Sequence, residues 1–454
     1  MREVFTRCVD PLRKSFVRAA LALGLLALGA GPGPALALPA PPGDVANAEQ
    51  VYAAARPRLL QIRTIVASAG RQYVIGSGFL VSGDGLAITN YHVVSAYALE
   101  PTTYRLEYTM TDGSQGKLDL LAIDVANDLA LVRLDRKDTP YFTFSARAVK
   151  GELQKGEQLY SMGNPLDLGF TIVDGTYNGL VDRTYNQRIH FSGALNPGMS
   201  GGPAVLPDGT VAGINVAHEQ GGELVSFLVP ARFAAALVDR AEENGGTPPK
   251  DFTAEIGRQF RDWQAGLYSS LEQMGFRSIA FGRYEAPEST APWFSCWGRT
   301  NVDDVPKPRA TVDASFCTSD TQLFIADDLN TGLVRLTHFY VKSDALNEFQ
   351  FAAFLSQELH PGFGNGWSRK WQTPQRCEEN FVATSAPGAR PTLRTVWCAR
   401  AYRAFPGLYD VTLTAVTEDS GREALVSNIA MQGVLYESAV SLGKKFIEAL
   451  QWTK

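Results

Sequence analysis

Short apolar runs that alternate with turn-forming residues dominate the chain from about residue 45 to residue 240. Each run is bounded by Gly, Asp or Asn residues that favour tight turns, a pattern typical of β-strands joined by hairpins. Runs of this kind occupy residues 73–82, 86–94, 104–110, 129–134, 210–217 and 224–230. Many short strands at this spacing predict a β-barrel or a β-sandwich.

The pattern changes after residues 242–251, which are rich in Gly and Pro. Apolar residues then recur at steps of three and four, as on one face of an amphipathic helix. They are Ile256, Phe260, Trp263, Leu267, Leu271 and Met274. Strand-like runs at 321–326, 333–341 and 409–416 alternate with helical patterns at 345–355 and about 431–450. Residues 250–454 are therefore expected to form a separate α+β domain.

The first forty residues differ from the rest of the chain. Basic residues precede an apolar run at 19–30, and the small-residue triplet 35–37 follows it. This order is typical of a secretory signal peptide, and we expect cleavage after Ala37 with residues 38–44 as a linker. An uncleaved membrane anchor is the alternative, although the run is short for a bilayer and GPGP interrupts it.

Length and composition describe an ordinary globular protein of two or three domains. The 454 residues are 45% hydrophobic and 20% charged, and the net charge of −5 gives no reason to expect a nucleic-acid partner. No His-Glu-x-x-His and no Cys-x-x-Cys spacing occurs. The sequence therefore predicts neither a metal nor a cofactor.

Four of the five cysteines lie between residues 296 and 398. An even number of cysteines in an exported protein predicts disulfides, and four cysteines allow three pairings. Both neighbouring pairs are 21 positions apart, which favours Cys296–Cys317 and Cys377–Cys398.

Residues 196–203 read NPGMSGGP and surround Ser200 with glycines. Gly-x-Ser-x-Gly also marks the nucleophile elbow of the α/β-hydrolases, which would make the chain a lipase or an esterase. That elbow requires a helix after the serine. Here Pro, Gly and an Asp-Gly pair follow and predict strand, turn and strand, so the elbow is disfavoured.

A base and an acid for Ser200 occur upstream of it. His92 follows an apolar strand, and Asp128 directly precedes the apolar run LALV, whereas the nearby Asp124 suits a turn. Each residue alone has an ordinary structural explanation. Together, in the order His, Asp, Ser on a β background, they predict a nucleophile, its base and a carboxylate that orients the base. The glycines would let the amides of Gly198 and Ser200 face one oxygen.

Three segments resemble the trypsin-like serine proteases, and among them the HtrA/Deg branch. They are GSGFLVSGDGLAITNYHVV at 76–94, DVANDLALVRL at 124–134 and NPGMSGGPAVLPDGTVAGINVA at 196–217. The resemblance implies an all-β double six-stranded barrel over residues 45–245, with the active cleft between the barrels.

The same resemblance implies a role for each site residue. His92 would be the general base, Asp128 its orienter and Ser200 the nucleophile of an exported endopeptidase that acts on proteins or peptides. The backbone amides of Gly198 and Ser200 would form the oxyanion hole. The substrate-binding residues implied by the resemblance are Leu195, Val216, Ala217 and His218.

The chain also departs from the HtrA pattern. Met199 stands where the branch usually has Asn, and Ala194 stands where trypsin has an Asp, which favours small or medium apolar residues at the cleavage site. Residues 250–454 do not resemble a PDZ domain, and three roles stay open for them: recruiting substrate, inhibiting the protease or docking on another envelope protein. Oligomeric state and natural substrate stay open. A chaperone or binding protein that uses a latent protease fold as a scaffold is the alternative function.

Overall fold

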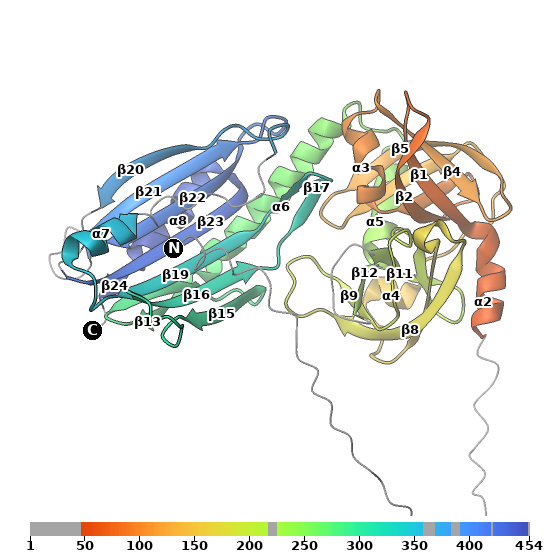
Figure 1. Ribbon diagram of the computed structural model, residues 1–454. Helices are drawn as coiled ribbons and strands as arrows, with labels where there is room; N and C mark the ends of the chain where they lie inside the picture. Colours follow the sequence, from red (N-terminus) through yellow and green to blue (C-terminus); the bar gives the residue numbers. More distant parts are fainter. Residues whose placement is uncertain (1–46, 217–224, 357–367, 383–390, 419–420, 453–454) are drawn as a thin grey trace, which may run out of the picture. The chain divides into compact units, whose positions relative to one another are not determined.

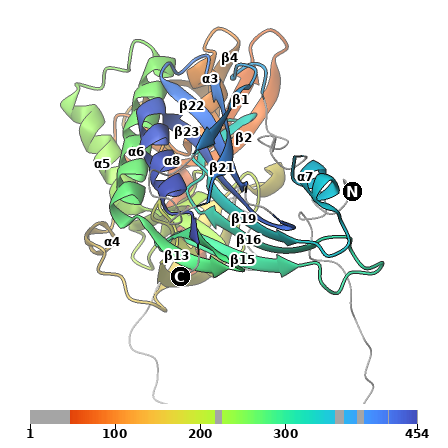
Figure 2. The same ribbon diagram turned by 90° about the vertical axis from the view of Figure 1, so that its left-hand side faces the viewer.

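The computed structural model describes residues 47–216, 225–356, 368–382, 391–418 and 421–452. Residues Val45–Lys454 form one compact unit by their internal contacts. Figures 1 and 2 show the helices and strands from two directions. The predicted signal peptide at 1–37 and linker at 38–44 lie outside the described residues. Among the described residues, no helix combines the length and the apolar character needed to cross a bilayer.

The first half of the chain folds into two closed six-stranded antiparallel barrels, which confirms the predicted fold class. Barrel 1 has the strand order β1-β2-β3-β6-β5-β4. Its strands are β1 (Leu59–Val66), β2 (Arg71–Leu80), β3 (Leu86–Thr89), β4 (Tyr104–Met110), β5 (Gln115–Asp124) and β6 (Leu129–Leu134). Helix α2 (Ala48–Ala55) and the 3₁₀ turn η1 (Arg56–Arg58) precede it.

Barrel 2 has the strand order β10-β11-β12-β9-β8-β7. Its strands are β7 (Gln158–Gly163), β8 (Thr171–Leu180), β9 (Ile189–Phe191), β10 (Pro203–Val205), β11 (Val211–Val216) and β12 (Ser226–Pro230). Around them lie α4 (Ala146–Lys150), η2 (Pro165–Asp167) and α5 (Ala231–Glu243). One core unites the barrels, because Leu59 and Phe79 of barrel 1 pack in the same cluster as Leu159 and Val211 of barrel 2.

The run at 86–94 is only partly a strand. Strand β3 ends at Thr89, and helix α3 (Tyr91–Leu99) begins two residues later. Val93 and Val94 are fully buried in this helix. A short continuous apolar run fits a buried strand and a buried helix equally well, so periodicity alone could not separate them.

The C-terminal region, Phe252–Trp452, begins with helix α6 (Phe252–Met274). Asp251 caps it by accepting hydrogen bonds from the backbone N–H groups of Thr253 and Ala254. The predicted apolar face is buried except at its last position, since Met274 is 44% exposed. The helix ends there, at Gly275, so its final turn has little left to pack against.

A seven-stranded antiparallel sheet follows in the order β15-β16-β19-β23-β22-β21-β20. Its strands are β15 (Phe294–Thr300), β16 (Thr311–Ser319), β19 (Val334–Lys342), β20 (Arg376–Val382), β21 (Leu393–Ala401), β22 (Leu408–Thr417) and β23 (Glu423–Leu435). Smaller sheets contain β13 (Phe276–Phe281), β14 (Tyr284–Ser289) and β24 (Gln451–Trp452), and β17 (Leu323–Ala326) with β18 (Leu329–Thr331). The remaining helices are α7 (Glu348–Ser356) and α8 (Tyr436–Glu448).

The prediction of a last helix from about residue 431 placed its start too early. Strand β23 continues to Leu435, and α8 begins at Tyr436. Ile429, Met431 and Val434 are all buried in the sheet core. Pairing with β22 on one side and β19 on the other holds this stretch extended, and tertiary pairing of that kind overrides a helical pattern.

Both favoured disulfides are present, and each lies at an edge of the seven-stranded sheet. Cys296–Cys317 joins edge strand β15 to β16, and Cys377–Cys398 joins edge strand β20 to β21. In each hairpin the two cysteines lie directly opposite one another in register. The disulfides therefore bind the outermost strands, which have a neighbour on one side only.

The C-terminal region shares a core with barrel 1. Leu60 and Tyr91 of barrel 1 belong to the same buried cluster as Phe260 of α6 and Leu336 of β19. This continuity accounts for the clustering of Val45–Lys454 as one unit.

Replacing Cys377 and Cys398 by Ser should destabilise the C-terminal region. The disulfide closes a loop with a sequence separation of 21, and in the chain-entropy account such a loop contributes about 3 kcal/mol. Urea unfolding of the double variant should show this loss, with the Cys296–Cys317 pair intact by mass spectrometry. An unchanged free energy of unfolding would contradict the structural role of the disulfide.

Candidate active site

Both oxygens of one carboxylate hold His92, one at its imidazole and the other at its backbone N–H. Oδ2 of Asp128 lies 2.7 Å from Nδ1 of His92, and Oδ1 accepts the backbone N–H of the same histidine at 2.9 Å. The side chains are 16% and 12% exposed. A carboxylate at Nδ1 makes this nitrogen the N–H donor, so Nε2 is left to accept a proton from another group.

Asp128 adopts a conformation that few residues other than glycine tolerate, with φ of +59°. Its carbonyl oxygen accepts hydrogen bonds from the N–H of Tyr91 at 3.2 Å and from Nδ2 of Asn90 at 2.8 Å. The turn before β6 is therefore tied to the start of α3, which positions the carboxylate under His92.

Asp124 has the turn role that the sequence suggested. Its carboxylate accepts hydrogen bonds from the backbone N–H and from Nδ2 of Asn127, at 3.1 and 3.0 Å. It also pairs with Arg240 of α5 at 3.4 Å. The residue closes the β5–β6 turn that carries Asp128.

The loop with Ser200 is fastened to barrel 1. The backbone N–H of Ser77 on β2 donates to the carbonyl of Ser200 at 2.7 Å, and the Ser77 hydroxyl donates to the carbonyl of Gly198 at 2.7 Å. A Cβ on Gly201 would lie 2.8 Å from the backbone nitrogen of Asn90. The structure thus brings the turn of Ser200 against the residues that precede His92.

Gly198 cannot be replaced by a larger residue without moving the backbone. Its φ is +96°, and a Cβ there would lie 2.4 Å from the carbonyl oxygen of Asn164. The sequence predicted that this position needs glycine, and the close approach of the two backbones supplies the reason.

Two residues that support the Ser200 turn were missed by sequence reasoning. One is Ser77, and the other is Asn215 on β11, whose Nδ2 donates to the carbonyls of Met162 and Met199. The carbonyl of Asn215 also accepts the N–H of Gly201 at 3.0 Å. Both lie inside segments that resemble the family, but no feature of residue type or spacing singled them out.

Two of the predicted substrate-binding residues are described. Leu195 is half-buried, and its N–H donates to the Ser226 hydroxyl at 3.1 Å. Val216 is buried and lines a cavity together with His92. Ala217 and His218 lie outside the described residues.

Comparison with known proteins agrees with this arrangement. Residues 76–214 match the family model described as trypsin-like peptidase domain. The protein named "probable periplasmic serine endoprotease DegP-like" from Chlamydia muridarum is 31% identical over 185 residues, which are 38% of this chain and 35% of that protein. A protein of the same name from Rhizobium meliloti is 32% identical over 177 residues, 37% of this chain and 34% of that protein.

Over residues 76–214 the double barrel is thus similar to the trypsin-like serine proteases of the HtrA/Deg type. Among solved structures, the serine endoprotease from Yersinia pestis shares 24% identity with a TM-score of 0.37, covering 44% of this chain and 68% of that chain. The chain spans little more than a third of the length of the two relatives described above.

The electrostatics of the trypsin-like domain favour a protonated His92 at mildly acidic pH. Burial lowers the pKa of His92, but the charge of Asp128, its hydrogen bond and the charge of Asp327 together raise this pKa above 6.5. His338 behaves in the opposite way, because burial in the C-terminal sheet lowers its pKa to about 4. His338 is therefore a neutral core residue bonded to Ser427 and to the carbonyl of Pro287.

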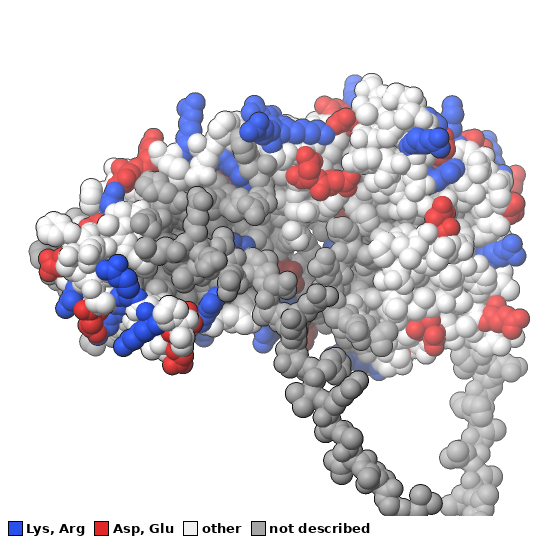
Figure 3. Space-filling model, in the orientation of Figure 1, with Lys and Arg blue, Asp and Glu red and all other residues white. Residues whose placement is uncertain are grey.

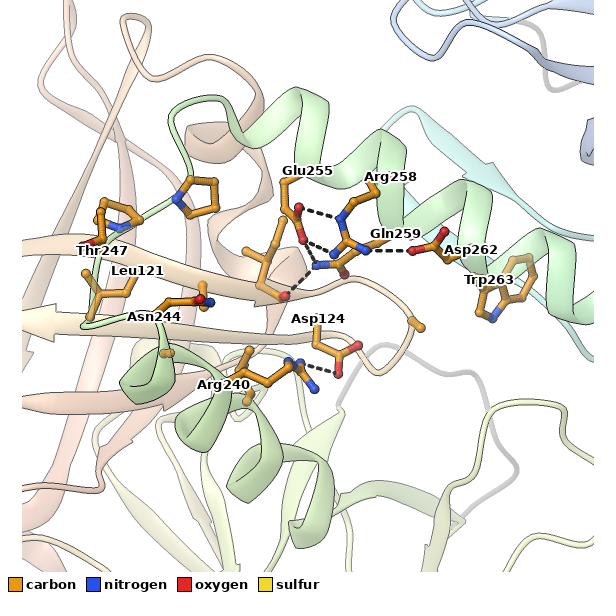
Figure 4. A pocket seen from close by; sticks show the side chains of 17 residues that line it. Leu121, Asp124, Arg240, Asn244, Thr247, Glu255, Arg258, Gln259, Asp262 and Trp263 are labelled. Atoms are coloured by element: carbon orange, nitrogen blue, oxygen red, sulfur yellow. Dashed lines mark hydrogen bonds and ion pairs between the residues drawn. The ribbon is translucent and has the colours of Figure 1, made fainter.

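Helix α6 of the C-terminal region holds the Asp128 turn of the trypsin-like domain. Gln259 donates from Nε2 to the carbonyl of Ile123 at 2.9 Å and accepts the N–H of Val125 at 2.8 Å. Figure 4 shows Gln259 reaching across from α6 to the strand above Asp124. Two helices therefore hold this turn: α5 through the ion pair of Arg240 with Asp124, and α6 through the hydrogen bonds of Gln259.

In the described part of the chain, one group of acidic, His and Cys side chains has metal-ligand spacing: Glu288, Cys296 and Cys317. Both sulfurs are joined in the disulfide described above. A metal there would require that disulfide to be reduced, because the thiolate is the ligand form of cysteine.

Replacing Gln259 by Leu should loosen the turn that carries Asp128. The carbonyl of Ile123 and the N–H of Val125 would lose their partners, at a cost of about 1–3 kcal/mol in the free energy of unfolding. Urea denaturation can measure this loss, with Gln273→Leu near the exposed end of α6 as the matched control. Equal stabilities of the two variants would show that α6 does not hold the turn.

Proposed function

We propose that this chain is a serine endopeptidase that cleaves peptide bonds through an acyl-enzyme on Ser200. The observation that carries the proposal is the contact of Asp128 with His92, which makes Nδ1 the N–H donor and gives Nε2 the role of a base, beside the turn of Ser200. Because serine is a weak nucleophile, it requires a base of this kind. The match of residues 76–214 to the trypsin-like peptidase model supports the same chemistry.

In the proposed reaction Oγ of Ser200 attacks the carbonyl carbon of the peptide bond, and Nε2 of His92 takes the hydroxyl proton. Asp128 stabilises the imidazolium that forms and keeps the ring oriented. The carbon–nitrogen bond then breaks as His92 returns the proton to the leaving amine. Water, deprotonated by His92 in the same way, releases the acyl group and restores Ser200.

The oxyanion of the tetrahedral intermediate would be held by the N–H groups of Gly198 and Ser200. The positive φ of Gly198 and the hydrogen bonds from Ser77 to both carbonyls of this turn support such a preorganised site. Preorganised donors are effective because they need no rearrangement when the charge develops.

The proposed substrates are proteins or peptides with a small or medium apolar residue before the cleaved bond. Leu195 and Val216 support this preference through their apolar side chains, and Ala217 and His218 complete the proposed pocket. Acidic and basic side chains are interspersed over the face shown in Figure 3, and no nucleic-acid partner is proposed.

The proposed location is the periplasm or the cell exterior, with processing or quality control of envelope proteins as the role. The names of the relatives from Chlamydia muridarum and Rhizobium meliloti support the location. In the proposed organisation, a signal peptide (1–37) and a linker (38–44) precede the protease domain (45–245). A C-terminal domain at 250–454 could bind a partner in the envelope.

Ser200→Ala should abolish peptide hydrolysis, with a loss on the order of 10⁵-fold or more, because the nucleophile and its base act as a unit. A fluorophosphonate probe should label the native protein at Ser200 and leave the variant unlabelled. Ser315→Ala, in the seven-stranded sheet, is a matched control that should keep full activity. Preserved turnover in Ser200→Ala would refute the assignment, and an unlabelled native protein would favour the scaffold alternative.

Hydrolysis should fall as the pH drops through the raised pKa of His92, because only the neutral imidazole accepts the serine proton. Asp128 and Asp327 are the negative groups that raise this pKa, while Arg188 and Asp320 line the same cavity. Asp327→Asn removes one of the two negative charges, so the acid limb of kcat/KM should move to lower pH. Asp313→Asn on the exposed part of β16 should leave the profile in place; an equal shift in both would contradict a local effect of Asp327.

A further inference from the structure

The hairpin of β17 and β18 brings the C-terminal region into contact with the catalytic histidine. The hydroxyl of Tyr91 on α3 donates to the carbonyl of Ile325 at 2.8 Å, in a buried hydrogen bond. The ring of Phe324 meets the rings of Tyr91 and His92 edge to face, with centroids 6.1 and 6.0 Å apart. An aromatic side chain from outside the trypsin-like domain therefore lies directly beside the proposed general base.

The hairpin is braced from its own side as well. The carboxylate of Asp328, in the turn between the two strands, accepts hydrogen bonds from Nε1 of Trp371 at 2.6 Å and from the Ser368 hydroxyl at 2.9 Å. Leu323 and Ile325 are buried. A hairpin held on both sides presents Phe324 as a fixed wall, since side chains locked by packing keep their rotamers.

A cavity of about 610 Å³ opens between this hairpin and the barrels. His92, Asp128 and Val216 line it from the barrels, and Leu323, Phe324 and Asn330 line it from the hairpin. Its size lies within the range of roughly 300–1,000 Å³ that is typical of ligand pockets. Val216 belongs to the pocket proposed above for the acyl side of the substrate, so the cavity continues that pocket.

The lining favours an uncharged occupant. Ala126, Val181 and Phe227 add apolar surface to the part formed by Val216 and Phe324. Arg188 and Asp320 line the same cavity with opposite charges. The charge of Arg188 acts on Asp320, so the two charges offset one another and neither sign of charged side chain is favoured. An apolar side chain would bury its surface against the aliphatic and aromatic walls.

We propose that Phe324 is a specificity-determining residue, which closes the acyl side of the substrate cleft beside His92. The cavity beside His92 binds an apolar side chain of the substrate, from a residue that precedes the cleaved bond. Phe324 limits the size of the side chain that fits. The inference rests on the proposed function for the identity of the occupant. It assigns to the C-terminal region a direct part in choosing the substrate.

The test measures binding without turnover. The probes are fluorescent hexapeptides with Ala, Leu or Phe at one position before the cleavable bond, bound to proteins that carry Ser200→Ala. Phe324→Ala should increase the affinity for the Phe peptide about tenfold relative to the affinity for the Ala peptide. Phe324→Trp should change this ratio of affinities in the opposite direction. Phe349→Ala is the matched control, because Phe349 is 89% exposed on α7, and it should keep the native ratio.

The outcomes separate the two proposals. If the protein with native Ser200 does not hydrolyse peptides but Phe324→Ala shifts the ratio of affinities, the proposed function is wrong and the role of Phe324 in binding stands. Hydrolysis with a binding ratio that Phe324→Ala leaves unchanged would end the role of Phe324. If Phe324→Ala does not fold, Phe324→Leu serves in its place and should shift the ratio in the same direction by a smaller factor; an unchanged ratio there would also overturn the proposal.

Discussion

The site depends on one carboxylate that binds two nitrogens of the same residue. Asp128 accepts from the main chain of His92 with one oxygen and faces its ring with the other. Such a hold sets both the position of α3 and the angle of the imidazole. Its geometry requires the left-handed backbone of Asp128, and the turn that adopts it is supported by Arg240 and Gln259 on two different helices.

This dependence connects the C-terminal region to the chemistry in two independent ways. Helix α6 holds the turn before Asp128, and Phe324 of the β17–β18 hairpin contacts the ring of His92. The continuous core between barrel 1 and the C-terminal sheet makes both contacts possible. A region that contacts His92 and holds the turn before Asp128 is part of the site's structure, even though it lies outside the barrels.

Much of the fold and site could be predicted because the signals are local. Apolar runs and turn residues predicted six of the barrel strands, the resemblance implied the double barrel, and a separation of 21 predicted both disulfide pairs. Two element boundaries were predicted wrongly. Helix α3 begins at Tyr91 inside a run predicted as a strand, and strand β23 extends to Leu435 where a helix was predicted. In both places buried apolar residues are compatible with either secondary structure, and only pairing with neighbouring strands decides between them.

By itself, the sequence predicted the residues of the proposed site, because His92, Asp128, Ser200 and the glycines near Ser200 stand in segments with their own turn and strand signals. Only the tertiary structure decided what surrounds them. Tyr91 and Ile325 are 234 positions apart, and Val125 and Gln259 are 134 apart. The sequence of one segment does not indicate which distant segment it will contact. Such contacts form when two folded surfaces pack together, and they depend on how well the shapes and polar groups of those surfaces match.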